Sequence, residues 1–190
     1  MYFVIEGHDG AGKSTVHQML KKELGEEFLF IKEPYYQVFI DEIMNTEDPI
    51  AKALFFAADR VKLMNSIITP AIAKGLHVVS DRSWITSEVY QWAQGADRTY
   101  IHSIQPFSRI PNIDHLFVLV CESETAVKRL KKGWDGYQSG SFLNEVKNKY
   151  IAFATSEYPN NSTIIHTGSL DAKEVCCMMK SVLTKQLNTI

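Results

Sequence analysis

The sequence predicts an α/β fold built on a mostly parallel sheet with helices on both faces. Short apolar runs alternate with helical patterns along the chain, the order that gives parallel strands joined by right-handed crossovers. The runs show little polar alternation, as expected for strands buried on both faces; they cover 2–5, 28–31, 76–80, 116–121 and 163–166. A length of 190 residues favours one domain, 1–190, with a sizeable core.

Apolar residues spaced by three and four predict the helices between these runs. We expect helices over 15–24, 50–74, 85–94, 97–107, 123–130, 142–153 and 170–187, and a short helix or aromatic loop beyond Pro34. Gly25 and Gly75 are natural helix stops, and Pro70 is expected to kink the long helix. The polar segment 131–141 contains three glycines and predicts a mobile loop.

Composition argues against several classes of partner. The net charge is −2, so nothing indicates a nucleic acid or an anionic membrane. The chain has no apolar run of transmembrane length, and its first apolar run leads directly into a glycine loop rather than a signal-peptide cleavage site. Cys121, Cys176 and Cys177 show no metal-ligand spacing, which favours reduced thiols in a cytoplasmic protein.

The segment after the first strand carries the clearest chemistry. It has the spacing G-x-x-x-x-G-K-[ST] between a predicted strand and a predicted helix, the context that makes this pattern a phosphate-binding loop. Glycines let backbone N–H groups approach phosphate oxygens, and the helix N-terminus adds partial positive charge. Lys13 is expected to reach the β/γ-phosphates, and Ser14 to hold Mg²⁺. The predicted ATP-binding residues here are Gly7, His8, Asp9, Gly10, Ala11, Gly12, Lys13, Ser14 and Thr15.

Polar clusters also follow the second and third strands, and parallel strands bring such clusters to one edge. Asp81 is placed to support Mg²⁺, and Arg82 to bridge the reacting phosphates. A strand-end salt bridge between these two is the alternative. Asp59 and Arg60 lie on the long helix, where an ordinary solvated face is equally compatible with the pattern. His8 is not assigned acid–base chemistry, because phosphoryl transfer to a phosphate acceptor needs no strong base.

The chain resembles the thymidylate kinases, a family of nucleoside-monophosphate kinases. The matching stretches are IEGHDGAGKST, KEP, LFFAADRVKL, VVSDR, TSEVYQ and YQSGSF, in the order of the family and over most of the chain. The resemblance implies transfer of the ATP γ-phosphate to dTMP with Mg²⁺. It also implies a five-stranded parallel sheet, a mobile lid at about 131–141 and a homodimer.

The resemblance also implies roles for individual residues. The catalytic residues would be Lys13, Arg82 and Asp9, with Asp9 at the deoxyribose 3′-hydroxyl. In the dTMP site Phe56 would stack on thymine, Arg60 would bind its O4, Tyr90 would pack under the sugar, and Ser87 and Gln91 would line the base pocket. Arg129 would pack on adenine.

Two departures from the family pattern bear most on the substrates. The family commonly has Glu-Pro-Gly-Gly after the second strand, whereas this chain has Tyr35 and Tyr36 in place of the two glycines. The lid position that commonly carries an arginine aligns with Gly136, where Lys131 or Lys132 would have to substitute without a bidentate fork. These departures leave open a kinase for another or several deoxynucleoside monophosphates. A non-catalytic nucleotide-binding module is a further alternative.

Overall fold

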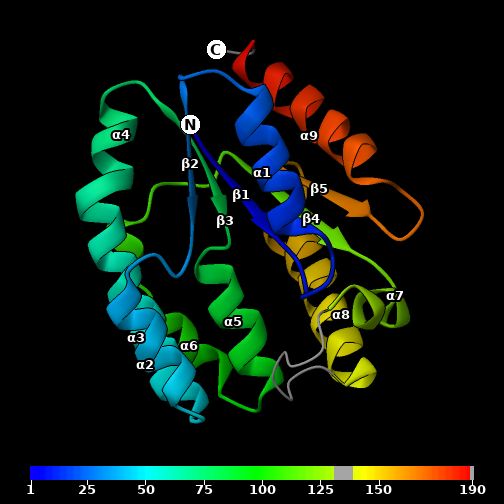
Figure 1. Cartoon of the computed structure of the whole chain (residues 1–190). Helices are drawn as coiled ribbons and strands as arrows, with labels where there is room; N and C mark the ends of the chain where they lie inside the picture. The colour runs from blue at the N-terminus through cyan, green and yellow to red at the C-terminus, as the bar shows by residue number, and fades with distance from the viewer. Residues whose placement is uncertain (131–138, 189–190) are drawn as a thin grey trace.

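The computed structural model describes residues 1–130 and 139–188. Its five strands form one parallel sheet in the order β2-β3-β1-β4-β5, and Figure 1 shows helices packed on both sides of it. The strands are β1 (Tyr2–Glu6), β2 (Phe28–Lys32), β3 (His77–Asp81), β4 (His115–Val120) and β5 (Ser162–His166). The predicted five-stranded α/β architecture is therefore confirmed.

The helical elements follow the predicted order with different ends. They are α1 (Lys13–Glu23), α2 (Gln37–Asn45), α3 (Pro49–Leu63), η1 (Met64–Ile68), α4 (Thr69–Ala73), α5 (Trp84–Ala93), α6 (Arg98–Ser103), η2 (Phe107–Arg109), α7 (Ser123–Arg129), α8 (Gly140–Glu157) and α9 (Ala172–Leu187). Among the described residues, no helix is both long and apolar enough to cross a membrane.

Alternation along β1 divides the core between the two faces of the sheet. Phe3 and Ile5 point to one face, where α1 and α9 supply Val16, Leu20, Val175 and Met179. Tyr2 and Val4 point to the other face, which η1, α5 and α8 cover. Figure 1 shows α1 and α9 side by side on their face. Because both faces are covered, β1 and β4 are buried along their whole length.

The long predicted helix 50–74 is three elements rather than one kinked helix. A π-helical turn, η1, separates α3 from α4, and Pro70 lies in the first turn of α4. Proline has no N–H, and its ring displaces the preceding turn. The backbone hydrogen bonds of the helix therefore change to a π-helical pattern on the N-terminal side of Pro70. The predicted helix over 97–107 is likewise interrupted, because Pro106 separates α6 from η2.

The strand registers place the functional segments at one edge. Asp81, the last residue of β3, is level with Ile5 of β1 and with Lys32 of β2. The glycine loop, the Glu33–Pro34 turn and Arg82 therefore leave the sheet together at its carboxyl edge, as expected for this topology. The predicted lid falls largely on 131–138, outside the described residues, and its last two residues, Gly140 and Ser141, begin α8.

Candidate active site

The loop between β1 and α1 has the backbone that a phosphate site requires. Gly7, Gly10 and Gly12 all have positive φ, which favours glycine. At Gly7 a side chain is also excluded by space, since a Cβ there would lie 2.0 Å from the carbonyl oxygen of Leu119. Helix α1 begins at Lys13, and its N-cap, Gly12, makes no side-chain cap. The first N–H groups of α1 are thus available to an anion.

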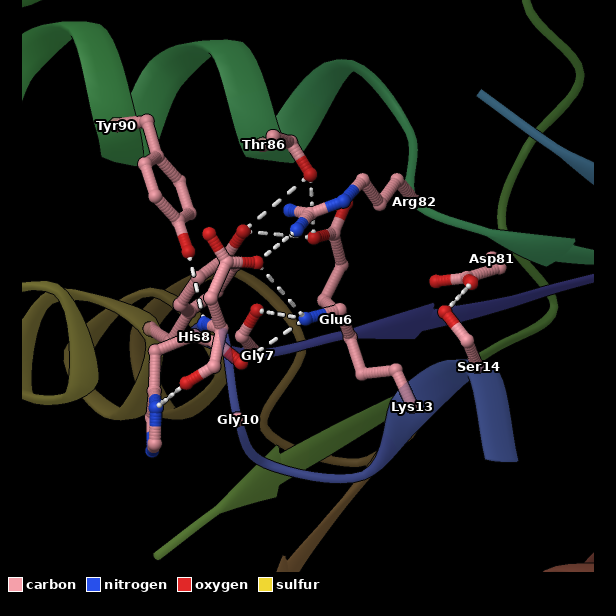
Figure 2. A network of polar contacts seen from close by, with 12 residues as sticks. Glu6, Gly7, His8, Gly10, Lys13, Ser14, Asp81, Arg82, Thr86 and Tyr90 are labelled. Carbon is pink, nitrogen blue, oxygen red and sulfur yellow. Dashed lines mark hydrogen bonds and ion pairs between the residues drawn. The ribbon is translucent and has the colours of Figure 1, made fainter. Parts of the chain in front are cut away.

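Lys13 is held inside this loop (Figure 2). Its ammonium group donates to the carbonyl oxygens of Gly7 at 2.7 Å and His8 at 2.9 Å, and lies 3.8 Å from the Asp9 carboxylate. Burial, reinforced by the nearby Arg82 guanidinium, lowers the pKa of Lys13 to about 8. The structure therefore places a buried and easily deprotonated cation at the floor of the loop.

Ser14 and Asp81 form a pair at the start of α1. The Ser14 hydroxyl donates to Oδ2 of Asp81 at 2.7 Å, while Oδ1 of Asp81 is buried without a partner among the described residues. A hydroxyl beside a carboxylate with a free oxygen suits Mg²⁺, which prefers oxygen ligands and few protein groups. The described residues contain no group of three or more His, Cys, Asp or Glu side chains that could hold a metal ion.

Arg82 and Asp9 form the opposite wall. The Arg82 guanidinium is hydrogen-bonded to the Asp9 carboxylate, and Arg82 has φ of 79°, an uncommon value for a residue with a side chain. Two bonds hold that backbone: its N–H donates to Ile5 O, and its carbonyl accepts from Ser80 Oγ. Burial opposes ionisation of Asp9, but Arg82 and Lys13 outweigh it, so the pKa of Asp9 lies below its ordinary value.

Tyr90 completes this wall from α5, as Figure 2 shows. Its hydroxyl accepts from the Asp9 backbone N–H at 2.9 Å, and the Arg82 guanidinium lies 5.5 Å from its ring centroid. Asp81 and Arg82 thus have separate partners, Ser14 and Asp9, rather than the strand-end salt bridge considered from the sequence.

Glu6 is a site residue to which the sequence analysis gave no role. It is fully buried at the end of β1 and accepts hydrogen bonds from Ser83, Thr86 and Tyr150 at 2.7 to 2.8 Å. A buried carboxylate with three donors ties β1 to the start of α5 and to α8. In the sequence, Glu6 is a charged residue directly after an apolar run, a position that could have indicated a buried polar role. It was read only as the residue before the glycine motif.

Arg60 is buried with only 1% of its surface exposed, so the solvated-face alternative for Asp59 and Arg60 is wrong. Its Nε donates to Oε2 of Glu33 at 2.8 Å, and its Nη2 lies 2.7 Å from the same oxygen in an ion pair. Its Nη1 donates to Gln105 at 2.6 Å. Burial raises the pKa of Glu33 to about 7 even though Arg60 acts in the opposite direction. Neither Glu33 nor Gln105 was expected to contact Arg60.

Asp59, the neighbour of Arg60, binds backbone N–H groups rather than side chains. Its carboxylate accepts the backbone N–H groups of Tyr35 and Tyr36 at 2.8 to 3.1 Å. The two tyrosines that replace the family's glycines are therefore fixed to α3 through their backbone. Their rings lie edge to face, 5.1 Å apart, and the Lys62 ammonium lies 4.1 Å from the Tyr36 ring centroid.

The remaining predicted acceptor-site residues lie on α3 and α5. Phe56 is one turn before Arg60 and half-buried. Ser87 and Gln91, one turn apart on α5, are buried, and their side-chain oxygens have no partner among the described residues. Unsatisfied buried oxygens call for an explanation, and a bound ligand is one.

A cavity of about 590 Å³ opens over the glycine loop. Its walls are Asp9, Gly10, Ala11, Gly12, Lys13, Ser14, Thr15, Val16, Lys32, Arg82, Arg129, Leu130, Thr167, Leu170, Asp171, Ala172 and Val175. Arg129, predicted to pack on adenine, donates to the backbone carbonyl and hydroxyl of Thr167 at 2.9 and 3.2 Å. A second cavity, of about 520 Å³, lies between Trp84 and Asn161 and contains none of the predicted site residues.

His8 has a structural position. Its buried ring lies between the Asp9 carbonyl oxygen, 2.8 Å from Nδ1, and the backbone of Cys121, whose O and N are 3.1 and 3.0 Å from Nε2. Burial lowers the pKa of His8 below its ordinary value. A neutral His8 ring therefore fixes the loop to the end of β4, and no proton transfer is assigned to it.

Comparison with known proteins gives one consistent result. A family model described as thymidylate kinase matches residues 5–176. A probable thymidylate kinase of Methanocaldococcus jannaschii is 33% identical over 181 residues, covering 92% of this chain and 91% of the relative. The thymidylate kinase of Brachyspira hyodysenteriae is 32% identical over 186 residues, covering 91% and 88%.

Solved structures agree at the level of the fold. The crystal structure of thymidylate kinase from Ehrlichia chaffeensis superposes with a TM-score of 0.79 at 22% identity, covering 96% of this chain and 98% of that one. Thymidylate kinase from Candida albicans gives the same TM-score and identity, covering 98% and 92%. With the family match over most of its length, this chain belongs to the thymidylate kinase family of ATP-dependent nucleoside-monophosphate kinases.

Proposed function

We propose that this protein transfers the γ-phosphoryl group of ATP to dTMP, giving dTDP for deoxynucleotide synthesis. The observation that carries the proposal is the convergence of Lys13, Ser14, Asp81, Arg82 and Asp9 at one edge of the sheet, beside an uncapped helix N-terminus. Phosphoryl transfer needs positioned reactants and neutralised charge rather than covalent help from the protein.

On the donor side, the glycine-loop N–H groups and the start of α1 bind the ATP phosphates. Lys13 exchanges the carbonyl oxygens of Gly7 and His8 for phosphate oxygens, at no cost in core packing. Arg129 flanks the mouth of the cavity, where adenine packs against its guanidinium plane. Arg82 lies between the donor and the acceptor and neutralises charge on the moving phosphoryl group.

Mg²⁺ fits the Ser14–Asp81 pair. Ser14 supplies a hydroxyl and Asp81 a carboxylate oxygen without another partner. When bound there, Mg²⁺ neutralises charge on the β- and γ-phosphates. The chain's own contribution is to hold these two oxygen donors at the carboxyl edge of β3 and the first turn of α1.

The acceptor, dTMP, lies on the α3 and α5 side. Phe56 stacks on the thymine ring, and Arg60 donates to the O4 carbonyl. Ser87 and Gln91 supply the unsatisfied oxygens of the base pocket. Tyr90 packs under the sugar and disfavours a 2′-hydroxyl, while Asp9 accepts from the 3′-hydroxyl. The Asp9 carboxylate is already bonded to Arg82, and the Asp9 backbone N–H to the Tyr90 hydroxyl.

The experiment that tests this proposal is a coupled ADP-release assay with ATP, Mg²⁺ and each nucleoside monophosphate in turn. We expect the highest kcat/KM with dTMP. Comparable rates with several deoxynucleoside monophosphates would favour the broad-range alternative. No ADP release with any acceptor would favour the non-catalytic module, which the assembled Lys13, Asp81 and Arg82 argue against.

We also propose that the protein forms a homodimer in the cytoplasm, and that its lid lies at about 131–141. The adjacent helices α2 and α3 expose the apolar side chains of Val38, Met44 and Leu54, between 47% and 64% of each, which supports a self-association surface. The free thiols of Cys121, Cys176 and Cys177 suit a reducing compartment. Light scattering after size-exclusion chromatography tests the dimer, which predicts twice the 21.6 kDa chain mass.

A further inference from the structure

The short helix α6 is docked against both walls of the proposed base pocket. Ile101 is fully buried and clusters with Ala53 of α3 and with Ala96, which lies beyond the end of α5. On the α5 side, Arg98 and His102 both bind the buried Glu88 carboxylate. Because α6 contacts two walls at once, the residues just after it are fixed relative to both.

Gln105 follows α6 and is only 6% exposed. Its amide nitrogen donates to the Ile101 carbonyl oxygen at 3.0 Å, and its amide oxygen accepts from Arg60 Nη1 at 2.6 Å. The opposite amide orientation would place an NH₂ group against a guanidinium, two sets of donors facing each other. The two partners therefore fix which way the Gln105 side chain faces.

Arg60 is consequently clamped from two sides. Glu33 accepts from Nε–H and forms an ion pair with Nη2, and Gln105 accepts one N–H of Nη1. A guanidinium has five N–H groups and no acceptor, so three N–H groups make no hydrogen bond to the described residues. All three belong to the terminal nitrogens, Nη1 and Nη2, and the contacts with Glu33 and Gln105 set the direction in which they point.

We propose that Gln105 is a positioning residue for pyrimidine selection, holding the guanidinium of Arg60 so that N–H groups of its terminal nitrogens meet a base carbonyl. This inference rests on the proposed role of Arg60 at the thymine O4. Thymine presents an acceptor at this position, whereas cytosine presents an amino donor. A fixed set of donors therefore rejects cytosine, and a guanidinium free to rotate loses that discrimination.

The test compares Gln105→Met, which keeps the side-chain length and removes the acceptor, with Gln105→Glu, which keeps an oxygen for Nη1. Calorimetry measures dTMP, dCMP and ATP binding. We expect Gln105→Met to weaken dTMP binding by about tenfold and to narrow the dTMP-to-dCMP affinity ratio by a similar factor, the scale of one hydrogen bond to a charged group. ATP affinity should stay at the wild-type value, and Gln105→Glu should keep the wild-type ratio.

Gln186→Met, on α9 and away from both walls, is the matched control, and circular dichroism checks the fold of each variant. An unchanged affinity ratio in Gln105→Met would overturn the inference. An equal loss in Gln105→Glu would also overturn it, since an acceptor oxygen would then be shown not to matter. If wild-type protein itself does not prefer dTMP to dCMP, the proposed base reading by Arg60 fails, whatever the variants do.

Discussion

The hydroxyl of Ser14 lies 2.7 Å from Oδ2 of Asp81, and Oδ1 of the same carboxylate has no partner among the described residues. The glycine loop and the end of β3, whose residues Ser14 and Asp81 are 67 positions apart in the chain, thus supply two neighbouring oxygen ligands for a cation. The pair depends on register, because Asp81 is level with Ile5 at the end of β1 and the glycine loop returns α1 alongside it.

Asp81→Asn keeps the shape of this pair and removes its charge. We predict a fall in kcat of about a hundredfold or more, the scale of losing one preorganised electrostatic group, together with a higher Mg²⁺ concentration for half-maximal rate. Steady-state kinetics over a Mg²⁺ titration measures both quantities. Asp41→Asn, on α2, is the control, and an unchanged Mg²⁺ dependence in Asp81→Asn would remove Asp81 from the metal site.

Lys13→Met should abolish most of the turnover and leave the fold intact. The variant removes a charge aimed at the phosphates, and kcat should fall at least about a hundredfold. The thermal midpoint should not fall, because a folded-state pKa near 8 means that burial disfavours the charged form of Lys13 at neutral pH. Differential scanning calorimetry and kinetics give both values; turnover near wild type in the folded variant would contradict the assignment.

The same lysine predicts an alkaline limit to activity. In the free enzyme the Lys13 pKa is about 8, against an ordinary value of 10.5. The charged form that attracts phosphate is therefore lost as pH rises through about 8, and kcat/KM for ATP should fall above that pH. A profile that stays flat to about pH 10 would show that Lys13 keeps its proton or does not bind the phosphates.

The Arg60–Glu33 pair predicts a stability effect with a pH dependence. Arg60→Ala leaves the buried Glu33 carboxyl and the Gln105 amide oxygen without their donor, so the free energy of unfolding should fall by about 1–3 kcal/mol. Adding Glu33→Gln should recover part of that loss. Chemical denaturation of the single and double variants measures it, and a loss in Arg60→Ala below about 1 kcal/mol would show that the buried pair does not hold the site together.

In the wild-type protein the Glu33 pKa is about 7, above its ordinary 4.5. The folded state then binds more protons than the unfolded state between these two values, so this group makes stability fall as pH rises through that window. Chemical denaturation at pH 5 and pH 7 tests the direction of this change in stability. Glu33→Gln is the control and should lack this contribution.

The phosphate loop was predictable because its chemistry is local. Strand, glycines, Lys13 and Ser14 are contiguous, and their spacing alone fixes what the backbone must do. Even so, α1 begins two residues earlier than predicted, because Gly12 adopts the left-handed conformation that lets the helix start at Lys13. Apolar periodicity cannot locate that start, since Lys13 and Ser14 are not apolar.

The acceptor side was only partly predictable because it is assembled from distant segments. The resemblance indicated Arg60, but its buried partners Glu33 and Gln105 lie 27 and 45 positions away, and no periodicity connects them. A solvated helix face was compatible with Asp59 and Arg60 until burial was known. The π-helical turn η1, which divides the long predicted helix, was not predictable either. Pro70 indicates that the helix is disturbed, but it does not specify on which side of the proline the disturbance lies.

Transfer of phosphate from ATP to dTMP can be followed with a labelled γ-phosphate. ATP carrying ³²P in its γ-position is incubated with dTMP, Mg²⁺ and the protein, and the products are separated by chromatography. We predict label in dTDP with wild-type protein and almost none with Lys13→Met. Label that stays in ATP or appears only as inorganic phosphate, with dTMP unchanged, would show that the protein does not phosphorylate dTMP.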